Sequence, residues 1–185
     1  MNKSILIIGR ISSGKSTIAK EIQRAIPNCR LISFGSYLKD YSEKRNYKID
    51  RQSLQDLGQQ FIDENPVNFL NSVVNHNKAK GGEVLIFEGV RHLPILSAIR
   101  KSYPVLLSIY LNIDVQTRYD RYLTRNKSID RIISKEEFLK ADNHKVELEI
   151  ESLKNGCDLV IDNGSVETIL IRIKEGIQFR GSHKR

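Results

Sequence analysis

Ser4-Ile5-Leu6-Ile7-Ile8-Gly9-Arg10-Ile11-Ser12-Ser13-Gly14-Lys15-Ser16-Thr17 is the stretch that decides the fold of this chain. It opens with the apolar run Ser4–Ile8, which is typical of a strand buried on both faces of a sheet. Glycines then break the run, and Lys15–Ile26 has the spacing of an amphipathic helix that stops at Pro27. The stretch therefore predicts a strand, a glycine-rich loop and a helix in immediate succession.

The loop Gly9–Ser16 has the pattern G-x-x-x-x-G-K-[ST]. Successive backbone N–H groups of such a loop can point at a phosphate, because glycines permit the required dihedral angles and a close approach. Lys15 is then expected to reach the β- and γ-phosphates, and the Ser16 hydroxyl to bind magnesium. We expect this loop to bind ATP with Mg²⁺ through Gly9, Ser12, Ser13, Gly14, Lys15, Ser16 and Thr17.

Strand-like and helix-like segments alternate through the rest of the chain. Four further apolar strands are expected, at 30–34, 84–87, 105–111 and 159–161. Five short strands separated by helices predict an α/β fold, a three-layer sandwich in which helices cover both faces of a five-stranded parallel sheet. No linker interrupts the pattern, so 1–185 is expected to be one domain. Ser134 and Glu137 form a capping box that predicts one long helix towards Lys154.

The composition is that of a globular protein, with 39% hydrophobic and 28% charged residues. Its net charge of +8 invites a polyanion as partner, such as nucleotide phosphates or nucleic acid. Cys29 and Cys157 lack a zinc-type spacing and suit a reducing compartment. The first apolar run is too short for a signal peptide or a membrane span, so we expect a cytoplasmic protein with no membrane partner.

Beyond the loop, the chain resembles the nucleotide-kinase branch of the phosphate-loop fold: nucleoside monophosphate kinases, dephospho-coenzyme A kinases and adenylate-kinase-like ATPases. In that family a glycine and an aspartate open the acceptor-site helix, and an arginine one turn later holds the acceptor phosphate. Here Ser36 stands for the aspartate and Lys39 for the arginine. The resemblance implies that residues 36–80 form a helical acceptor-binding insertion and that the acceptor contacts Phe34, Gly35, Tyr37, Lys39 and Arg91.

The third strand is followed by Glu88-Gly89-Val90-Arg91, which resembles the Asp-Gly-(Ile/Val)-Arg element of dephospho-coenzyme A kinase-like proteins. Ligand crevices lie at the carboxyl ends of parallel strands, so Glu88 is expected beside the phosphate loop. Glu88 could orient the magnesium shell or accept a proton from an acceptor hydroxyl. Arg91 could grip the acceptor phosphate. The alternative is a carboxylate that caps the next helix and pairs with Arg91.

Arg118, Arg121 and Arg125 lie at i, i+3 and i+7 of a predicted helix and are expected to share one face. They resemble the arginines with which the lid of nucleotide kinases closes over the phosphates. This implies a short lid at about 118–133, with Arg118 binding the nucleotide and the other two in phosphoryl transfer. A solvated basic helix is the alternative. On the following helix, a surface charge network is expected from Asp142, His144 and Glu147.

The leading hypothesis is a kinase that moves the γ-phosphoryl of ATP to a small nucleotide-like acceptor. Catalysis would then rest on Lys15, Glu88, Arg91, Arg121 and Arg125, with Ser16 and Glu88 holding the metal. A regulatory ATPase or binding module stays open because of the departures at Ser36 and Lys39. A kinase that acts on nucleic-acid ends is ranked last, because no aromatic-rich basic strip supports base stacking. The sequence identifies neither the acceptor nor the oligomeric state.

Overall fold

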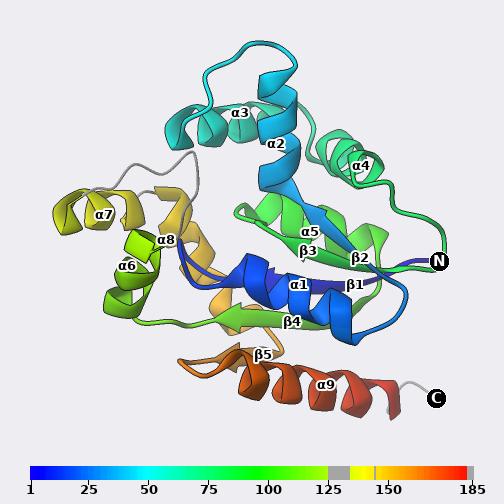
Figure 1. The fold of residues 1–185 in the computed structure, drawn as a ribbon. Coiled ribbons are helices and arrows are strands. Elements are labelled where there is room, and N and C mark those ends of the chain that lie inside the picture. Colours follow the sequence, from blue (N-terminus) through cyan, green and yellow to red (C-terminus); the bar gives the residue numbers. More distant parts are fainter. Residues whose placement is uncertain (125–133, 144, 183–185) are drawn as a thin grey trace.

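A computed structural model of the chain describes residues 1–124, 134–143 and 145–182 (Figure 1). In these residues one sheet of parallel strands has the order β2-β3-β1-β4-β5. Its strands are β1 (Lys3–Ile8), β2 (Cys29–Ser33), β3 (Val84–Glu88), β4 (Val105–Leu111) and β5 (Leu159–Ile161). The predicted five-stranded parallel sheet is confirmed.

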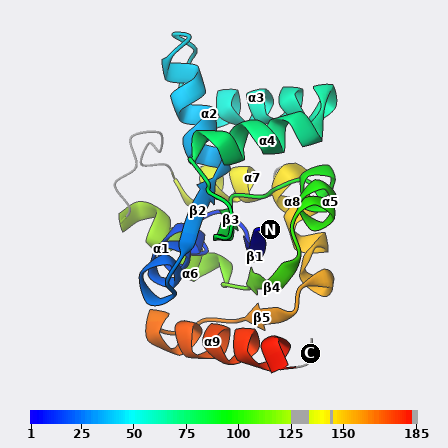
Figure 2. The same cartoon turned by 90° about the vertical axis from the view of Figure 1, so that its right-hand side faces the viewer.

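Helices cover both faces of the sheet (Figures 1 and 2). They are α1 (Lys15–Ala25), α2 (Phe34–Glu43), α3 (Arg51–Glu64), α4 (Pro66–His76), α5 (Leu93–Ser102), α6 (Val115–Thr124), α7 (Lys135–Asp142), α8 (Lys145–Ser152) and α9 (Val166–Ser182), with a 3₁₀ turn at Lys154–Gly156. None of those in the described part of the chain is long and apolar enough to cross a membrane.

The side chains of β1 alternate between two cores, as the period of a strand requires. Ile5 and Ile7 point to the face covered by α1 and α9, where they are fully buried with Ile22 and Ile173. Leu6 and Ile8 point to the opposite face, which is covered by α4, α5 and α8. Both faces of β1 are therefore apolar, and this strand lies at the centre of the sheet.

Helices α2 and α3 stand beyond the carboxyl ends of β2 and β3, and α4 leads from α3 back over the face of the sheet (Figure 1). Their starts follow from local sequence. Asp50 caps α3 by accepting a 2.8 Å hydrogen bond from the Ser53 N–H, and Asn65 caps α4, with Pro66 at its first position. The three helices pack together through aromatic rings, including Phe61 stacked on Phe69. Helices α2 and α3 thus form a wall above the edge of the sheet that carries the phosphate loop, and α4 anchors them to the core.

The prediction of one long helix from Ser134 towards Lys154 is wrong. The capping box is present, but α7 ends at Asn143, whose φ of −88° and ψ of 8° leave the helical path, and α8 follows separately. On one continuous helix, Asp142 and Glu147 would point about 140° apart. In the structure both side chains are buried, 3% and 1% exposed. The break between the helices permits both to face the interior.

Candidate active site

The phosphate loop runs from the end of β1 to the start of α1. Gly9 has a φ of 152°, and Gly14, the N-cap of α1, has a φ of 94°. A Cβ at Gly9 would lie 2.9 Å from the Leu111 carbonyl oxygen and 2.7 Å from Ser13 Oγ. Glycine is thus required at Gly9 both by its dihedral angles and by the neighbouring strand β4.

Lys15 crosses the hollow of this loop. Its Nζ donates hydrogen bonds to the carbonyl oxygens of Gly9 at 2.7 Å and Arg10 at 2.6 Å. Ser12, Ser13, Gly14, Ser16 and Thr17 line the same cavity as Lys15. The loop therefore collects backbone N–H groups, a helix N-terminus and an ammonium around one space, which suits a phosphate chain.

Glu88 joins the loop to the neighbouring strand β2. It is paired with Ile7 of β1 and with Ser33 of β2 in the sheet register. Its carboxylate accepts a hydrogen bond of 3.2 Å from the Ser16 hydroxyl and one of 2.6 Å from the Ser33 hydroxyl. Glu88 therefore lies beside the phosphate loop, as the sequence predicted.

A hydroxyl and a carboxylate oxygen at this distance fit Mg²⁺, which prefers oxygen ligands and usually binds one or two carboxylates plus substrate phosphates. Within the described residues, no group of three or more His, Cys, Asp or Glu side chains could hold a metal by itself. Ser16 and Glu88 could therefore supply two ligands of a metal whose other ligands come from substrate or water.

The cavity at this edge of the sheet has a volume of about 950 Å³. Its described lining carries a single carboxylate, that of Glu88, and six cationic side chains: Lys15, Lys20, Lys39, Arg51, Arg91 and Arg121. Helices α2 to α5 also contribute six apolar lining residues, namely Phe34, Leu38, Leu54, Ile62, Phe69 and Ile95. The cavity thus combines a strongly cationic lining, suited to anionic groups, with an apolar wall, suited to an organic body.

The segment at the start of α2 that was expected to bind the acceptor lines this cavity only in part. Phe34, Gly35 and Lys39 line it, and Lys39 also pairs with Glu43 at 3.6 Å. Tyr37 is not among the lining residues. Its ring packs against Phe61 and other aromatic side chains, with centroids 6.1 Å apart for that pair. Tyr37 thus belongs to the packing of the insertion.

The structure separates two of the arginines that were expected to act together. Arg121 Nη1 donates a 3.2 Å hydrogen bond to the Ser13 carbonyl oxygen, so this side chain reaches over the phosphate loop. Arg118 is only 3% exposed and binds Asp142 through both Nη atoms, with one bond of 2.8 Å. The two arginines do share a face towards the loop, since Arg118 Nη1 also donates to the Ile11 carbonyl oxygen at 3.3 Å, but Arg118 is engaged by a buried carboxylate and only Arg121 lines the cavity.

Arg125, His144 and most of the predicted lid, 125–133, lie outside the described residues. The expected surface charge network is wrong for Asp142 and Glu147, since both are buried. Asp142 holds Arg118 and also Arg10, at 3.1 Å. A buried carboxylate is tolerated when arginines pair with it in this way.

Glu147 was not predicted as a site residue, yet it lies directly behind the phosphate loop. One carboxylate oxygen accepts a 2.9 Å hydrogen bond from the Ile11 N–H, and the other pairs with Arg91. Burial raises the pKa of Glu147, but the charges of Arg91 and Lys15 and the Ile11 N–H outweigh it and lower the pKa below its ordinary 4.5. Glu147 is therefore ionised at neutral pH.

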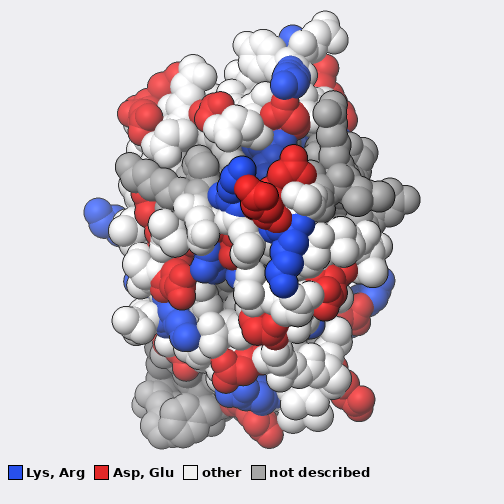
Figure 3. Space-filling view, turned by 90° about the vertical axis from the view of Figure 1, so that its left-hand side faces the viewer, with Lys and Arg blue, Asp and Glu red and all other residues white. Residues whose placement is uncertain are grey.

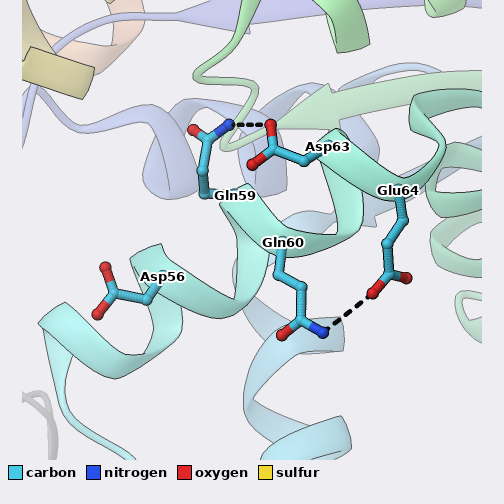
Figure 4. Close-up of a pocket in the computed structure, with 5 residues that line it drawn as sticks. All are labelled: Asp56, Gln59, Gln60, Asp63 and Glu64. Carbon is cyan, nitrogen blue, oxygen red and sulfur yellow. Dashed lines mark hydrogen bonds between the residues drawn. The ribbon is translucent and has the colours of Figure 1, made fainter.

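A second, shallow depression of about 500 Å³ lies on the outer face of α3 (Figure 4). Gln59 pairs with Asp63 at 2.7 Å and Gln60 with Glu64 at 2.9 Å, each one turn along the helix. Asp56 also lines it. Carboxylates and amides that pair along one helix are typical of a solvated face, and their charge opposes phosphate binding. The candidate site is therefore the cationic cavity.

A phosphate loop on the first strand, a 2-3-1-4-5 parallel sheet and a cationic cavity under a helical insertion together define the nucleotide-kinase branch of the phosphate-loop fold. Residues 5–147 match the model of the AAA domain family, and this chain belongs to that family. The resemblance seen in the sequence is thereby confirmed.

Solved structures agree in fold. Shikimate kinase from Bacteroides thetaiotaomicron matches with a TM-score of 0.59 and 14% identity, over 95% of this chain and 98% of that chain. Shikimate kinase from Aquifex aeolicus matches with a TM-score of 0.61 and 15% identity, over 95% and 96%. A sugar kinase from Janibacter sp. HTCC2649 matches with a TM-score of 0.61 and 13% identity, over 96% and 95%. No curated protein sequence matches the chain.

Proposed function

We propose that this protein is an ATP- and Mg²⁺-dependent phosphotransferase whose acceptor is a small phosphorylated, nucleotide-like molecule. The observation that carries the proposal is the single cavity in which the phosphate loop faces a second set of cations. Lys15 and Arg121 lie on the loop side, and Lys39, Arg51 and Arg91 come from the insertion and from the end of β3. Two anionic groups can therefore be brought together, which in-line phosphoryl transfer requires.

The loop side of the cavity supplies the groups that a triphosphate needs. Lys15 is the expected partner of the β- and γ-phosphates, and Ser16 and Glu88 are the expected protein ligands of the metal. When bound there, Mg²⁺ would supply positive charge to the phosphate oxygens. Arg121, which lies over Ser13 and Gly14, is positioned to stabilise charge that spreads over the transferring group.

The insertion side supports a phosphorylated acceptor with an apolar or planar body. Arg51, Arg91 and Lys39 offer positive charge, while the apolar lining residues from α2, α3 and α5 can cover a ring system. Shikimate and a sugar, named for the similar structures, represent a competing class of hydroxyl acceptors. Such acceptors carry one carboxylate or no charge, and so would use fewer of these cations than a phosphorylated acceptor, whose phosphate can accept several charge-assisted hydrogen bonds.

A regulatory ATPase is the second candidate, and one observation favours it. Lys39, which stands where the resembling family has its acceptor arginine, pairs with Glu43 on its own helix at 3.6 Å. That pairing weakens Lys39 as an anion ligand. The nucleic-acid kinase has less support. On the face shown in Figure 3, basic and acidic side chains of the described residues are interspersed and form no continuous basic path.

The test is a coupled ADP-release assay with ATP and Mg²⁺ across all nucleoside and deoxynucleoside monophosphates, dephospho-coenzyme A, shikimate and common hexoses. Lys15→Ala is the control, because it removes the ammonium from the loop without changing the insertion. We expect one phosphorylated acceptor to raise ADP release well above the ATP-only rate, and Lys15→Ala to abolish the increase. Tight ATP binding with no responsive acceptor would instead support the regulatory ATPase.

A further inference from the structure

One buried carboxylate contacts both sides of the proposed site. Glu147 is 1% exposed and lies on α8, outside the phosphate loop and outside the acceptor segment. Its Oε2 accepts the Ile11 N–H of the loop at 2.9 Å, and its Oε1 pairs with the guanidinium of Arg91. Arg91 in turn lines the cavity and keeps a quarter of its side chain exposed. Glu147 therefore links the loop to the acceptor side through two bonds.

Apolar packing contributes to the docking of α8 beside this charge. Ile150 and Leu153, which follow Glu147, are 1% and 5% exposed and belong to the apolar core under α4 and α5. A buried carboxylate carries a desolvation penalty, and well-packed apolar residues often serve stability equally well. If this position served only to dock α8, an apolar side chain would serve as well.

The contact also changes what Arg91 can do. An arginine side chain loses rotamer entropy when it is fixed, and pre-organisation removes that cost from ligand binding. A guanidinium has five N–H donors. Glu147 engages Nη1 of Arg91, so an acceptor anion can be bound by the remaining donors. At the same time the bond to Ile11 fixes the loop against the same carboxylate.

We propose that Glu147 is a positioning residue, which holds Arg91 and the phosphate loop in one fixed arrangement so that acceptor and nucleotide bind in register. The acceptor half rests on the proposed function, because it assumes an anion on Arg91. The nucleotide half does not, because it needs only ADP on the loop. The two halves can therefore be measured separately.

The variant is Glu147→Gln, which keeps the shape of the side chain and removes its charge. The matched control is Glu151→Gln, one turn along the same helix, whose carboxylate is 55% exposed and pairs with Arg10 at 3.0 Å. For the acceptor found in the screen, we expect Glu147→Gln to raise KM about tenfold, a loss of ~1.4 kcal/mol. For methylanthraniloyl-ADP, we expect its Kd to rise about threefold. Glu151→Gln should change neither constant.

Arg91→Lys tests the same link through the partly exposed partner of Glu147. This variant can replace Glu147→Gln if that protein does not fold. It should raise the acceptor KM and also weaken methylanthraniloyl-ADP binding, although Arg91 belongs to the acceptor side. In the double variant the losses should not add, because either change alone breaks the link. A Glu147→Gln protein that matches Glu151→Gln in both constants, or an Arg91→Lys protein with unchanged ADP binding, would overturn the inference. If no acceptor is found, the proposed function fails and the ADP measurements still decide on Glu147.

Discussion

The Ser33 hydroxyl donates a 2.6 Å hydrogen bond to the carboxylate of Glu88, which is its direct partner across strands β2 and β3. Ser33 is also the N-cap of α2, because its Oγ accepts the Ser36 N–H at 3.3 Å. Since Glu88 further accepts the Ser16 hydroxyl, the expected metal carboxylate lies between the phosphate loop and the start of the acceptor helix. A change at Glu88 should therefore affect both sides of the site.

Glu88→Gln should lower kcat by about 100-fold or more, because it removes the negative charge beside the expected metal while keeping the side-chain shape. The Mg²⁺ concentration needed for half-maximal activity should rise in the same variant. Both are read from a magnesium titration of the ADP-release rate. Glu136→Gln, which removes a 79% exposed carboxylate on α7, is the control and should match the wild type. An unchanged magnesium dependence in Glu88→Gln would remove Glu88 from the metal site.

Gly9→Ala should destabilise the fold by about 1–3 kcal/mol, since the new Cβ would meet the Leu111 carbonyl oxygen and would sit at a φ of 152°. Gly81→Ala is the matched control, because nothing lies within 4 Å of a Cβ there and its φ is not positive. The free energy of unfolding is measured by urea denaturation. Equal stabilities of the two variants would contradict the close approach of the loop to β4.

Arg118→Met should lower the free energy of unfolding by about 3–5 kcal/mol, because it leaves the buried carboxylate of Asp142 without its main partner. The folded fraction of the variant should bind ATP with nearly the wild-type KM, since the Arg118 guanidinium is engaged by Asp142 and is not among the lining residues of the cavity. Urea denaturation and ATP titration together check this. A large rise in the ATP KM with normal stability would restore the nucleotide-binding role first expected for Arg118.

The stabilisation that the Glu147 charge provides should depend on pH in one direction. The folded-state pKa of Glu147 lies below its ordinary 4.5, so its contribution is complete above pH 4.5 and is lost as the pH falls through the lowered pKa. Wild type should therefore exceed Glu147→Gln in stability by about 1–3 kcal/mol at pH 7. The difference should shrink below pH 4.5, as measured by urea denaturation between pH 3 and pH 7. A difference that grows on acidification would mean that Glu147 is protonated in the native state.

The features that the sequence predicted well are those encoded over a few consecutive residues. The loop Gly9–Ser16 and the capping box of Ser134 with Glu137 each depend on residues close along the chain, and each is found in the structure. The strands were found for the same reason, since short apolar runs between turn signals define them locally. The sheet then brings Glu88 to the loop by a general rule of parallel sheets.

The errors concern charges whose partners are distant along the chain. Glu147 accepts hydrogen bonds from Ile11 and Arg91, which lie 136 and 56 positions away along the chain. The spacing of residues on its own helix cannot predict these partners. Arg118 has the same helical spacing to Arg121 whichever anion it binds. Its partner Asp142, 24 positions away, is buried because α7 ends at Asn143. Tertiary pairing thus decides which charges serve the fold and which face the cavity.

The family resemblance predicts that Tyr37 contacts the acceptor. In the structure its ring instead packs against the rings of Tyr41, Phe61, Phe69 and His76. Tyr37→Phe keeps that ring and should leave both the acceptor KM and the stability close to wild type. Tyr37→Ala should cost about half of the ~3–5 kcal/mol typical of a fully buried aromatic ring, because Tyr37 is only partly buried. Urea denaturation and acceptor titration of both variants separate the two roles. If Tyr37→Phe raises the acceptor KM several-fold at unchanged stability, the hydroxyl binds the acceptor, and the insertion must move to bring it into the cavity.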